Sequence, residues 1–308
     1  MYTLRNRIPT FVLGLLLPAC ADEASTSNSP ASPGHHSETP ARTIADPQVS
    51  TTAVTFVGAG DIAGCASPYY HDEATATLLL NISGTVFTTG DNVYRDGTPY
   101  QYENCYNPSW GQFKSRTRPS PGNHDYNTSA AAGYFGYFGT PAGPCCRGYY
   151  TYMLGGWRIY SLNSETNLSS QLTWLQGHLV NHPADCVLAY WHWPLYSTGP
   201  MGSSTRMYRA FNALYRAGAE LVLTGHDHNY QRFAPMDADG HSTGVGVRQF
   251  VIGTGGAQLA DFPNSAPNLE RRFKAWGVLK LSLSKGAYQW EFISTTGSTL
   301  DSGGGTCH

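Results

Sequence analysis

The sequence predicts an α/β (α+β) fold in which two facing β-sheets are flanked by helices. From about residue 51, short apolar runs alternate with stretches of helical periodicity, and each run ends near a Gly-Asp, Gly-Asn or His motif. Buried strands appear as continuous apolar runs, and strands that alternate with helices indicate βαβ units. Because ligands bind at the carboxyl ends of strands in open α/β sheets, we expect the loops after these runs to form the functional site.

The expected elements can be placed in chain order. Strands that end at the motif loops are expected at Val54–Gly58, Thr85–Thr89, Arg118–Pro121, Cys186–Trp191 and Leu221–Thr224. Helices are expected where leucines and aromatic residues recur at helical spacing, over His71–Leu80, Ser169–Val180 and Met207–Ala217. Hairpins are expected where two strand-like runs flank a glycine-containing turn, at Tyr150–Leu162 and Val278–Ile293.

The composition indicates one large folded domain. The chain has 308 residues, of which 41% are hydrophobic and 13% are charged. That is enough apolar material for one large core, which we expect over residues 51–308. A net charge of −2 argues against nucleic-acid binding, which usually requires a basic face.

The N-terminal 20 residues resemble an export signal. Two arginines precede an apolar run that is too short to span a bilayer and that ends in Leu-Pro-Ala before Cys20. This ending is similar to a bacterial lipobox, whose cysteine is lipidated; because a proline is unusual there, ordinary signal-peptidase cleavage is the alternative. Residues 21–50 are rich in Ser, Pro, Ala, Thr and Glu, which is typical of a disordered tether. We therefore predict an exported protein, either a cell-envelope lipoprotein anchored through Cys20 or a secreted one.

The cysteine content agrees with export, because disulfides persist outside the cytosol. Apart from Cys20 there are six cysteines, which permit many connectivities. We pair Cys65 with Cys105, because each follows one of the first two motif loops and these loops must lie close together. The pairs Cys186–Cys307 and Cys145–Cys146 then follow.

Eight side chains of the motif loops form the candidate site. Carboxylate, phenolate, amide and imidazole donors suit Fe, Zn or Mn better than they suit a structural thiolate zinc site. A single Gly-Asp occurs by chance in many loops, and Asp also favours turns and helix N-caps, but several ordered motifs support one another. The eight residues are Asp61, Asp91, Tyr94, Asn123, His124, His192, His226 and His228.

The order of these motifs resembles that of the calcineurin-like metallophosphoesterases. The motifs are Gly60-Asp61, Gly90-Asp91-Asn92-Val93-Tyr94, Gly122-Asn123-His124-Asp125, His192 and Gly225-His226-Asp227-His228. A tyrosine three residues after Asp91 is similar to the purple acid phosphatase-like branch. The resemblance covers residues 54–256 and implies the four-layer metallophosphoesterase fold, with the catalytic domain over residues 51–308.

The same resemblance implies the ligands of two metal ions. Asp61, Tyr94 and His228 would hold the first ion, Asn123, His192 and His226 would hold the second, and Asp91 would bridge both. A tyrosinate ligand implies Fe(III) as the first ion, with Zn, Mn or Fe(II) as the second. His124 would steady the phosphate and protonate the leaving group, and Asp125 would orient His124.

The implied function is an exported hydrolase of small phosphate monoesters that uses a metal-bound hydroxide. A phosphodiesterase or nucleotidase with the same ligands is the alternative, because the pocket walls decide between them. A non-catalytic envelope lipoprotein that binds phosphorylated ligands is a third possibility, which the complete ligand set disfavours. Trp193 follows His192 where related sequences often have a polar residue, so we expect Trp193 to form a wall of the pocket.

Overall fold

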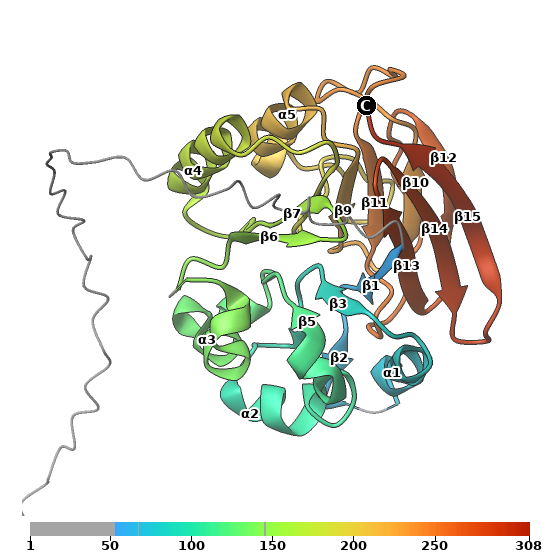
Figure 1. Cartoon of the computed structure of the whole chain (residues 1–308). Coiled ribbons are helices and arrows are strands. Elements are labelled where there is room, and N and C mark those ends of the chain that lie inside the picture. The colour runs from blue at the N-terminus through green and yellow to red at the C-terminus, as the bar shows by residue number, and fades with distance from the viewer. Residues whose placement is uncertain (1–52, 67, 145) are drawn as a thin grey trace, which may run out of the picture. The chain divides into compact units, whose positions relative to one another are not determined.

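The computed structural model describes residues 53–66, 68–144 and 146–308, and these residues form four layers (Figure 1). Two β-sheets pack face to face. Helices α1 (Asp72–Leu80), α2 (Pro99–Gln101) and α3 (Ala132–Phe138) lie beside one sheet, and α4 (Leu168–Asn181) and α5 (Tyr208–Arg216) lie beside the other. The predicted arrangement of two facing sheets with helices outside is confirmed.

The first sheet combines parallel and antiparallel strands. In the described part of the chain its order is β15–β14–β13–β1–β3–β5. The strands β1, β3 and β5 run parallel, whereas β13, β14 and β15 pair antiparallel. Their bounds are β1 Val54–Ala59, β3 Thr85–Thr88, β5 Thr117–Arg118, β13 Gly277–Ser284, β14 Ala287–Ser294 and β15 Thr299–Thr306.

The second sheet has a parallel centre and antiparallel edges. Its order among the described residues is β12–β10–β11–β9–β8–β7–β6, in which β7, β8, β9 and β11 are parallel. The bounds are β6 Tyr150–Leu154, β7 Trp157–Ser161, β8 Val187–Tyr190, β9 Leu221–Thr224, β10 Tyr230–Phe233, β11 Arg248–Ile252 and β12 Leu269–Phe273. A short parallel pair, β2 (Ala63–Gly64) with β4 (Val93–Tyr94), joins the loops that follow β1 and β3.

Alternation along the strands divides the apolar residues among three cores. In β1, Phe56 belongs to the core between the sheets, whereas the next residue, Val57, packs on the outer face toward α1. In β8, Leu188 lies between the sheets and Ala189 packs outward, toward α4 and α5. Because successive side chains of a strand point to opposite faces, each sheet requires helices on its outside, which explains the four layers.

Sequence reasoning missed β15 because of its glycines. Gly303 and Gly305 lie in this edge strand although glycine is unfavourable in strands. A Cβ atom at Gly303 would lie 2.2 Å from the Trp290 ring, and one at Gly305 would lie 2.6 Å from the Tyr288 hydroxyl oxygen. The glycines therefore allow two large aromatic side chains of β14 to pack against the backbone of its neighbour.

Two of the predicted disulfides are present. Cys65–Cys105 joins the loop after β2 to the π-helical turn Tyr102–Tyr106, with Cα atoms 5.1 Å apart. Cys186–Cys307 joins the start of β8 to the C-terminal end of the chain, with Cα atoms 5.4 Å apart. The predicted pair Cys145–Cys146 includes a residue outside the described ranges, and it stays a prediction.

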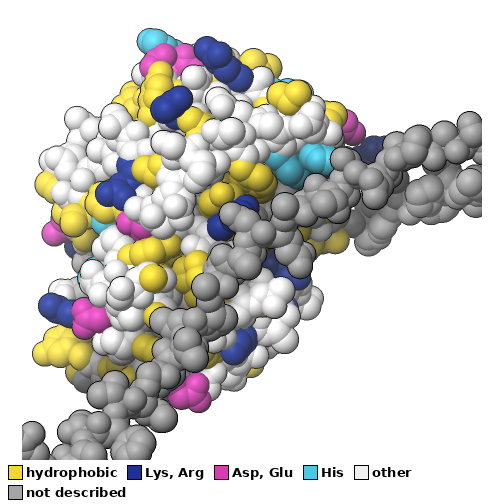
Figure 2. Space-filling view, turned by 90° about the vertical axis from the view of Figure 1, so that its left-hand side faces the viewer, with side chains coloured by type: hydrophobic (Ala, Val, Ile, Leu, Met, Phe, Trp, Pro, Cys, Tyr) yellow, Lys and Arg dark blue, Asp and Glu magenta, His cyan; other side chains and the backbone are white. Residues whose placement is uncertain are grey.

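The distribution of surface charge and the apolar character of the helices are relevant to nucleic-acid and membrane binding. On the face in Figure 2, Lys and Arg side chains are dispersed among uncharged and acidic ones. No helix within the described ranges is long and apolar enough to cross a membrane. The predicted signal (residues 1–20), lipid-anchor Cys20 and tether (residues 21–50) lie outside the described residues, so these assignments stay predictions.

Glu220 is a buried carboxyl group just before β9. Its Oε2 accepts a hydrogen bond from the backbone N–H of Val187 at 2.7 Å, and its Oε1 accepts one from the N–H of His308 at 3.2 Å. Burial raises the pKa of Glu220 from 4.5 to about 7. The protonated form is therefore favoured in the folded chain. Its contribution to stability is fully present below pH 4.5 and is lost as the pH rises through about 7.

Replacing Glu220 with glutamine is expected to remove this pH dependence. The free energy of unfolding of the wild type, relative to that of Glu220→Gln, should fall by about 3 kcal/mol from low to neutral pH. Urea unfolding at a series of pH values measures this difference. His308 Nδ1 lies 4.0 Å from Glu220 Oε1, so His308→Gln is the control and should keep most of the dependence. Parallel pH profiles for the wild type and Glu220→Gln would contradict the assignment.

Candidate metal centre

The predicted site residues come together at one edge of the two sheets. They occupy the loops that follow β1, β3, β5, β8 and β9, and all eight lie in one neighbourhood. Backbone groups of one loop bind side chains of another: the His226 N–H donates to Asp61 Oδ2, and the His124 N–H donates to Asp91 Oδ1, each at 2.8 Å. The loops from the two sheets are thus joined through the candidate ligands themselves.

Three of the site residues have an unusual backbone conformation. Asp61, Asp91 and His226 have φ values of 59°, 48° and 72°, in the left-handed region that non-glycine residues rarely adopt. Such conformations concentrate at functional sites, where the surrounding structure holds them. Each residue follows a glycine. A Cβ atom at Gly225, for example, would lie 2.6 Å from Asp61 Oδ2, so a larger residue there would displace the carboxylate.

A first group of donor atoms surrounds the hydroxyl of Tyr94. This oxygen lies 2.8 Å from Asp61 Oδ1, 3.2 Å from Asp91 Oδ2 and 3.0 Å from His228 Nε2. His228 Nε2 is itself 3.3 Å from Asp61 Oδ1, and the other ring nitrogen, Nδ1, lies 2.9 Å from the carbonyl oxygen of Gln258. A carbonyl can only accept, so Nδ1 carries a proton and Nε2 faces the donor group.

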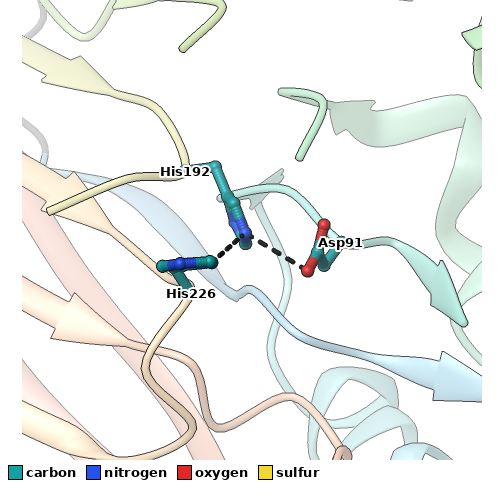
Figure 3. A group of neighbouring side chains, drawn as sticks. All are labelled: Asp91, His192 and His226. Carbon is teal, nitrogen blue, oxygen red and sulfur yellow. Dashed lines mark hydrogen bonds and ion pairs between the residues drawn. The ribbon is translucent and has the colours of Figure 1, made fainter. Parts of the chain in front are cut away.

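A second group of donor atoms surrounds His192 Nε2 (Figure 3). This nitrogen lies 3.2 Å from Asp91 Oδ2, 3.0 Å from Asn123 Oδ1 and 3.1 Å from His226 Nδ1. His192 Nδ1 lies 2.8 Å from the carbonyl oxygen of Thr89, which again leaves Nε2 to face the site. Asp91 Oδ2 therefore belongs to both donor groups and lies between them.

The buried carboxylates dominate the electrostatics of the site. Burial alone would lower the pKa of His192, but the charge of Asp91 and a hydrogen bond to it raise that pKa to about 10. Burial would likewise lower the pKa of His228, but a hydrogen bond to Asp61 and the charge of Asp61 raise that pKa to about 9. Burial and both carboxylates raise the pKa of Tyr94 well above 10. Tyr94, His192 and His228 therefore retain their protons, as groups beside excess negative charge do.

The donor atoms present fit a pair of metal ions. Tyr94 has one hydroxyl proton but two neighbouring carboxylate oxygens, of Asp61 and Asp91, that could accept it. His226 Nε2 is buried and has no hydrogen-bond partner among the described residues. Burial and the charge of His192 lower the pKa of His226 to about 3, so its imidazole is neutral, which is the form that binds metals. Bound cations would supply the positive charge that these oxygen and nitrogen atoms lack.

His124 is placed beside the donor groups rather than within them. Its Nδ1 lies 2.6 Å from the carbonyl oxygen of Arg95 and therefore carries a proton. Its Nε2 lies 3.9 Å from Asp91 Oδ2, and the side chain is 30% exposed. This nitrogen is thus open to a ligand that enters the site.

Asp125 differs from its predicted role as the group that orients His124. Its carboxylate accepts hydrogen bonds from the Gly122 N–H at 2.8 Å, from Asn92 Nδ2 at 3.0 Å and from the Tyr102 hydroxyl at 2.5 Å. The carbonyl of Arg95 orients His124 instead. Asp125 begins a short 3-10 turn, and its side chain is fully buried. It therefore secures the Gly122–His124 loop.

Trp193 contacts the site through His226. The centroids of the Trp193 and His226 rings are 3.7 Å apart. The guanidinium of Arg206 lies over the Trp193 ring, 4.9 Å from its centroid. Trp193 therefore supports a candidate ligand, and its expected role as a wall of the pocket stays a prediction, because the lining of neither cavity at the centre includes it. Arg206, Arg95, Gln258 and Thr89 were missed by sequence reasoning, the last three because they act through backbone carbonyls, which leave no mark in the side-chain sequence.

Two residues next to the last motif take structural positions. Asp227 accepts a hydrogen bond from the Met201 N–H at 3.0 Å and one from the Ser197 hydroxyl, so its carboxylate is bound to the loop that follows β8. Arg232 pairs with Asp301, with Nε 2.7 Å from Oδ2, and stacks on Trp290. Neither side chain takes part in the site.

The comparisons with known proteins agree with this geometry. The family model of calcineurin-like phosphoesterases matches residues 55–230. Purple acid phosphatase 21 of Arabidopsis thaliana is 32% identical over 115 residues, which are 35% of this chain and 25% of that protein. The chain thus spans a quarter of the length of this curated relative.

Solved structures show the same fold. Purple acid phosphatase PPD1 from yellow lupin (Lupinus luteus) seeds has a TM-score of 0.65 at 19% identity, covering 84% of this chain and 54% of that one. GAP50, described as the anchor in the inner membrane complex of Plasmodium, has a TM-score of 0.64 at 13% identity, covering 83% and 90%. Since the family model matches more than half of the sequence, the chain belongs to the calcineurin-like phosphoesterases.

Proposed function

We propose that this protein is an exported dinuclear-metal phosphoesterase that hydrolyses phosphate monoesters. The observation that carries the proposal is the position of Asp91 Oδ2, which lies 3.2 Å from the Tyr94 oxygen of one donor group and 3.2 Å from His192 Nε2 of the other. A carboxylate oxygen shared by two sets of metal-type donors is what a two-metal centre requires.

The two donor groups suggest the ligands of each ion. Tyrosinate is a hard, anionic donor, and the pKa of Tyr94 lies well above 10 in the absence of a cation, so a strongly charged ion such as Fe(III) suits this side. Imidazole and amide donors on the other side suit Zn, Mn or Fe(II). We assign Asp61, Tyr94 and His228 to the first ion, Asn123, His192 and His226 to the second, and Asp91 to both.

The chain's own residues would position the ester and move a proton. A bound metal pair supplies Lewis acidity and a nucleophile that is available near neutral pH. His124 presents Nε2 to the site while the Arg95 carbonyl holds its Nδ1 proton. A protonated Nε2 can hold a phosphate oxygen and then donate its proton to the departing oxygen. Asp125 keeps the His124 loop in place through Gly122.

Turnover of matched aryl substrates tests this function. The metal-loaded full chain should hydrolyse an aryl phosphate monoester faster than the corresponding diester, and it should lose this activity on chelation and regain it when metal is restored. A phosphodiesterase or nucleotidase is the second candidate, because a cavity of about 640 Å³ beside the centre has room for a second esterified group. Preference for the diester would favour that candidate, and full activity after complete metal removal would contradict both.

Replacing Tyr94 with phenylalanine is expected to remove the visible absorption of the purified protein. Phenylalanine keeps the ring beside Tyr70 and His124 but has no oxygen for a ferric ion. Absorption spectroscopy, with metal analysis of the same sample, measures the change. Tyr70→Phe is the matched control and should keep the band. An unchanged band in Tyr94→Phe would remove the tyrosinate assignment.

We also propose that the chain is exported. The two disulfides suit an oxidising compartment. Intact-mass analysis of protein from a bacterial host should show removal of residues 1–19 and a lipid on Cys20. An unlipidated product cut nearby would support the secreted form, and an uncut N-terminus would contradict both.

A further inference from the structure

A cavity of about 640 Å³ opens directly beside the proposed metal centre. Its lining includes three residues of the site, Tyr94, His124 and His228, so a phosphate held at the centre would direct its ester group into this space. The lining also includes the side chains of Tyr69, Tyr70 and Arg95, which the proposed chemistry does not use.

The two tyrosines form an aromatic wall. Tyr69 is 67% exposed, which is unusual for a large side chain with an apolar ring. The Tyr70 ring lies 5.7 Å from the Tyr94 ring, and it rests against Gly64, where a Cβ atom would come within 2.2 Å of the ring. The backbone N–H of Tyr69 donates to the carbonyl oxygen of Ala66 at 3.0 Å, and the nearby Cys65 forms a disulfide with Cys105. An exposed aromatic surface suits a planar ligand.

Arg95 supplies an uncommitted positive charge in the same cavity. Its side chain is exposed and makes no ion pair or hydrogen bond to any other residue in the described ranges. Its backbone carbonyl lies 2.6 Å from His124 Nδ1, which fixes the residue at the border between the cavity and the centre. A guanidinium without a protein partner matches the oxygens of a phosphate or carboxylate.

We propose that this cavity is a subsite for leaving groups that are both planar and anionic, as in a nucleoside diphosphate, and that Tyr69 and Arg95 determine this specificity. The inference rests on the proposed function. The terminal phosphate would lie at the metal centre, the remaining phosphate would contact Arg95, and the base would stack on the tyrosine wall. In the reaction, the oxygen of water joins the terminal phosphorus. The bridging oxygen keeps the electron pair of the broken P–O bond and leaves with the nucleoside monophosphate.

Four substrates separate the two parts of the subsite. Adenosine diphosphate has a leaving group with a ring and a charge, adenosine monophosphate has the ring alone, pyrophosphate has the charge alone, and glycerol 3-phosphate has neither. The value of kcat/KM for each substrate, divided by that for glycerol 3-phosphate, measures the preference.

Tyr69→Ala should lower the ratio for adenosine monophosphate about tenfold, since base stacking on an aromatic side chain contributes this much. Arg95→Met should lower the ratio for pyrophosphate about tenfold, since it removes a charge-assisted contact. The ratio for adenosine diphosphate should fall in both variants.

Matched controls make the result specific. Tyr69→Phe keeps the ring and should keep the preference. Tyr100→Ala and Arg209→Ala remove exposed side chains that do not line this cavity, and their ratios should match those of the wild type. Turnover of all four substrates with ratios that neither Tyr69→Ala nor Arg95→Met alters would overturn the subsite and leave the phosphoesterase intact. No turnover of any substrate by the metal-loaded wild type would overturn the proposed function itself.

Discussion

Replacing Asp91 with alanine is expected to abolish the binding of both metal ions and to lower kcat at least about a thousandfold, because each metal-dependent contribution to catalysis is worth several kcal/mol. Asp91 Oδ2 lies within 3.2 Å of the Tyr94 oxygen and of His192 Nε2, so its removal takes a donor from each group. Asp91 Oδ1 also accepts the His124 N–H at 2.8 Å, so the loop that carries His124 loses an anchor as well. Metal analysis and turnover of one purified sample measure both effects.

Two further variants separate ligand loss from misfolding. Asp91→Asn keeps the shape of the side chain but lacks the charge and one acceptor oxygen, and it should fold like the wild type while losing most of its metal. Asp239→Ala removes an exposed carboxylate of a second acidic cluster, with Asp237 and His241, and should retain full metal content and activity. Near-normal metal content in a folded Asp91→Ala variant would contradict the bridging role.

Replacing His124 with alanine is expected to preserve both metal ions and lower kcat by about 10²–10⁴-fold, the usual contribution of a general acid. His124 Nε2 is 3.9 Å from Asp91 Oδ2, outside both donor groups, and the ring is partly exposed to the cavity. The loss should be larger for an alkyl phosphate than for a nitrophenyl phosphate, because a poor leaving group needs the proton more. Steady-state kinetics with the two substrates measures this difference.

The leaving-group dependence distinguishes a proton donor from a structural residue. If His124 only supported the loop, its loss would slow both substrates to the same extent. His241→Ala removes a histidine that is 79% exposed and lies outside the site, and it should leave both rates unchanged. Loss of metal from His124→Ala would assign this residue to the ligand set instead.

The parts of the fold that could be predicted are those with local signals. The strands β1, β3, β8 and β9 are continuous apolar runs in the sequence, and each is followed by a residue that the geometry brings into the site, such as Asp61 or His226. Parallel strands present their carboxyl ends at one edge, so separate motifs along the sequence could be expected to converge. The expected strand Arg118–Pro121 overlaps the observed β5, Thr117–Arg118, at a single residue, and β5 is shorter than β1, β3, β8 and β9, the other strands that lead into the site.

The parts that could not be predicted depend on contacts between distant segments. The family resemblance implied that Asp125 orients His124, but the carboxylate accepts hydrogen bonds from Asn92 and Tyr102, which only the packed loops bring near. Strand β15 was missed because glycine is unfavourable in strands. Its glycines make room for aromatic rings of the neighbouring strand, a contact that the local sequence does not reveal. The cavity beside the centre likewise joins Tyr69 to Arg95, two residues that no sequence motif connects.

The central claim is that Asp91 lies between two metal ions. Anomalous diffraction from crystals of the full chain, with data collected on both sides of the iron absorption edge, tests it most directly. Two metal peaks are expected ~3.5–4 Å apart, with Asp91 Oδ2 between them. The peak beside the Tyr94 oxygen should be iron, and the other should lie beside Asn123 Oδ1 and His192 Nε2. A single peak, or two peaks that do not share Asp91, would contradict the account.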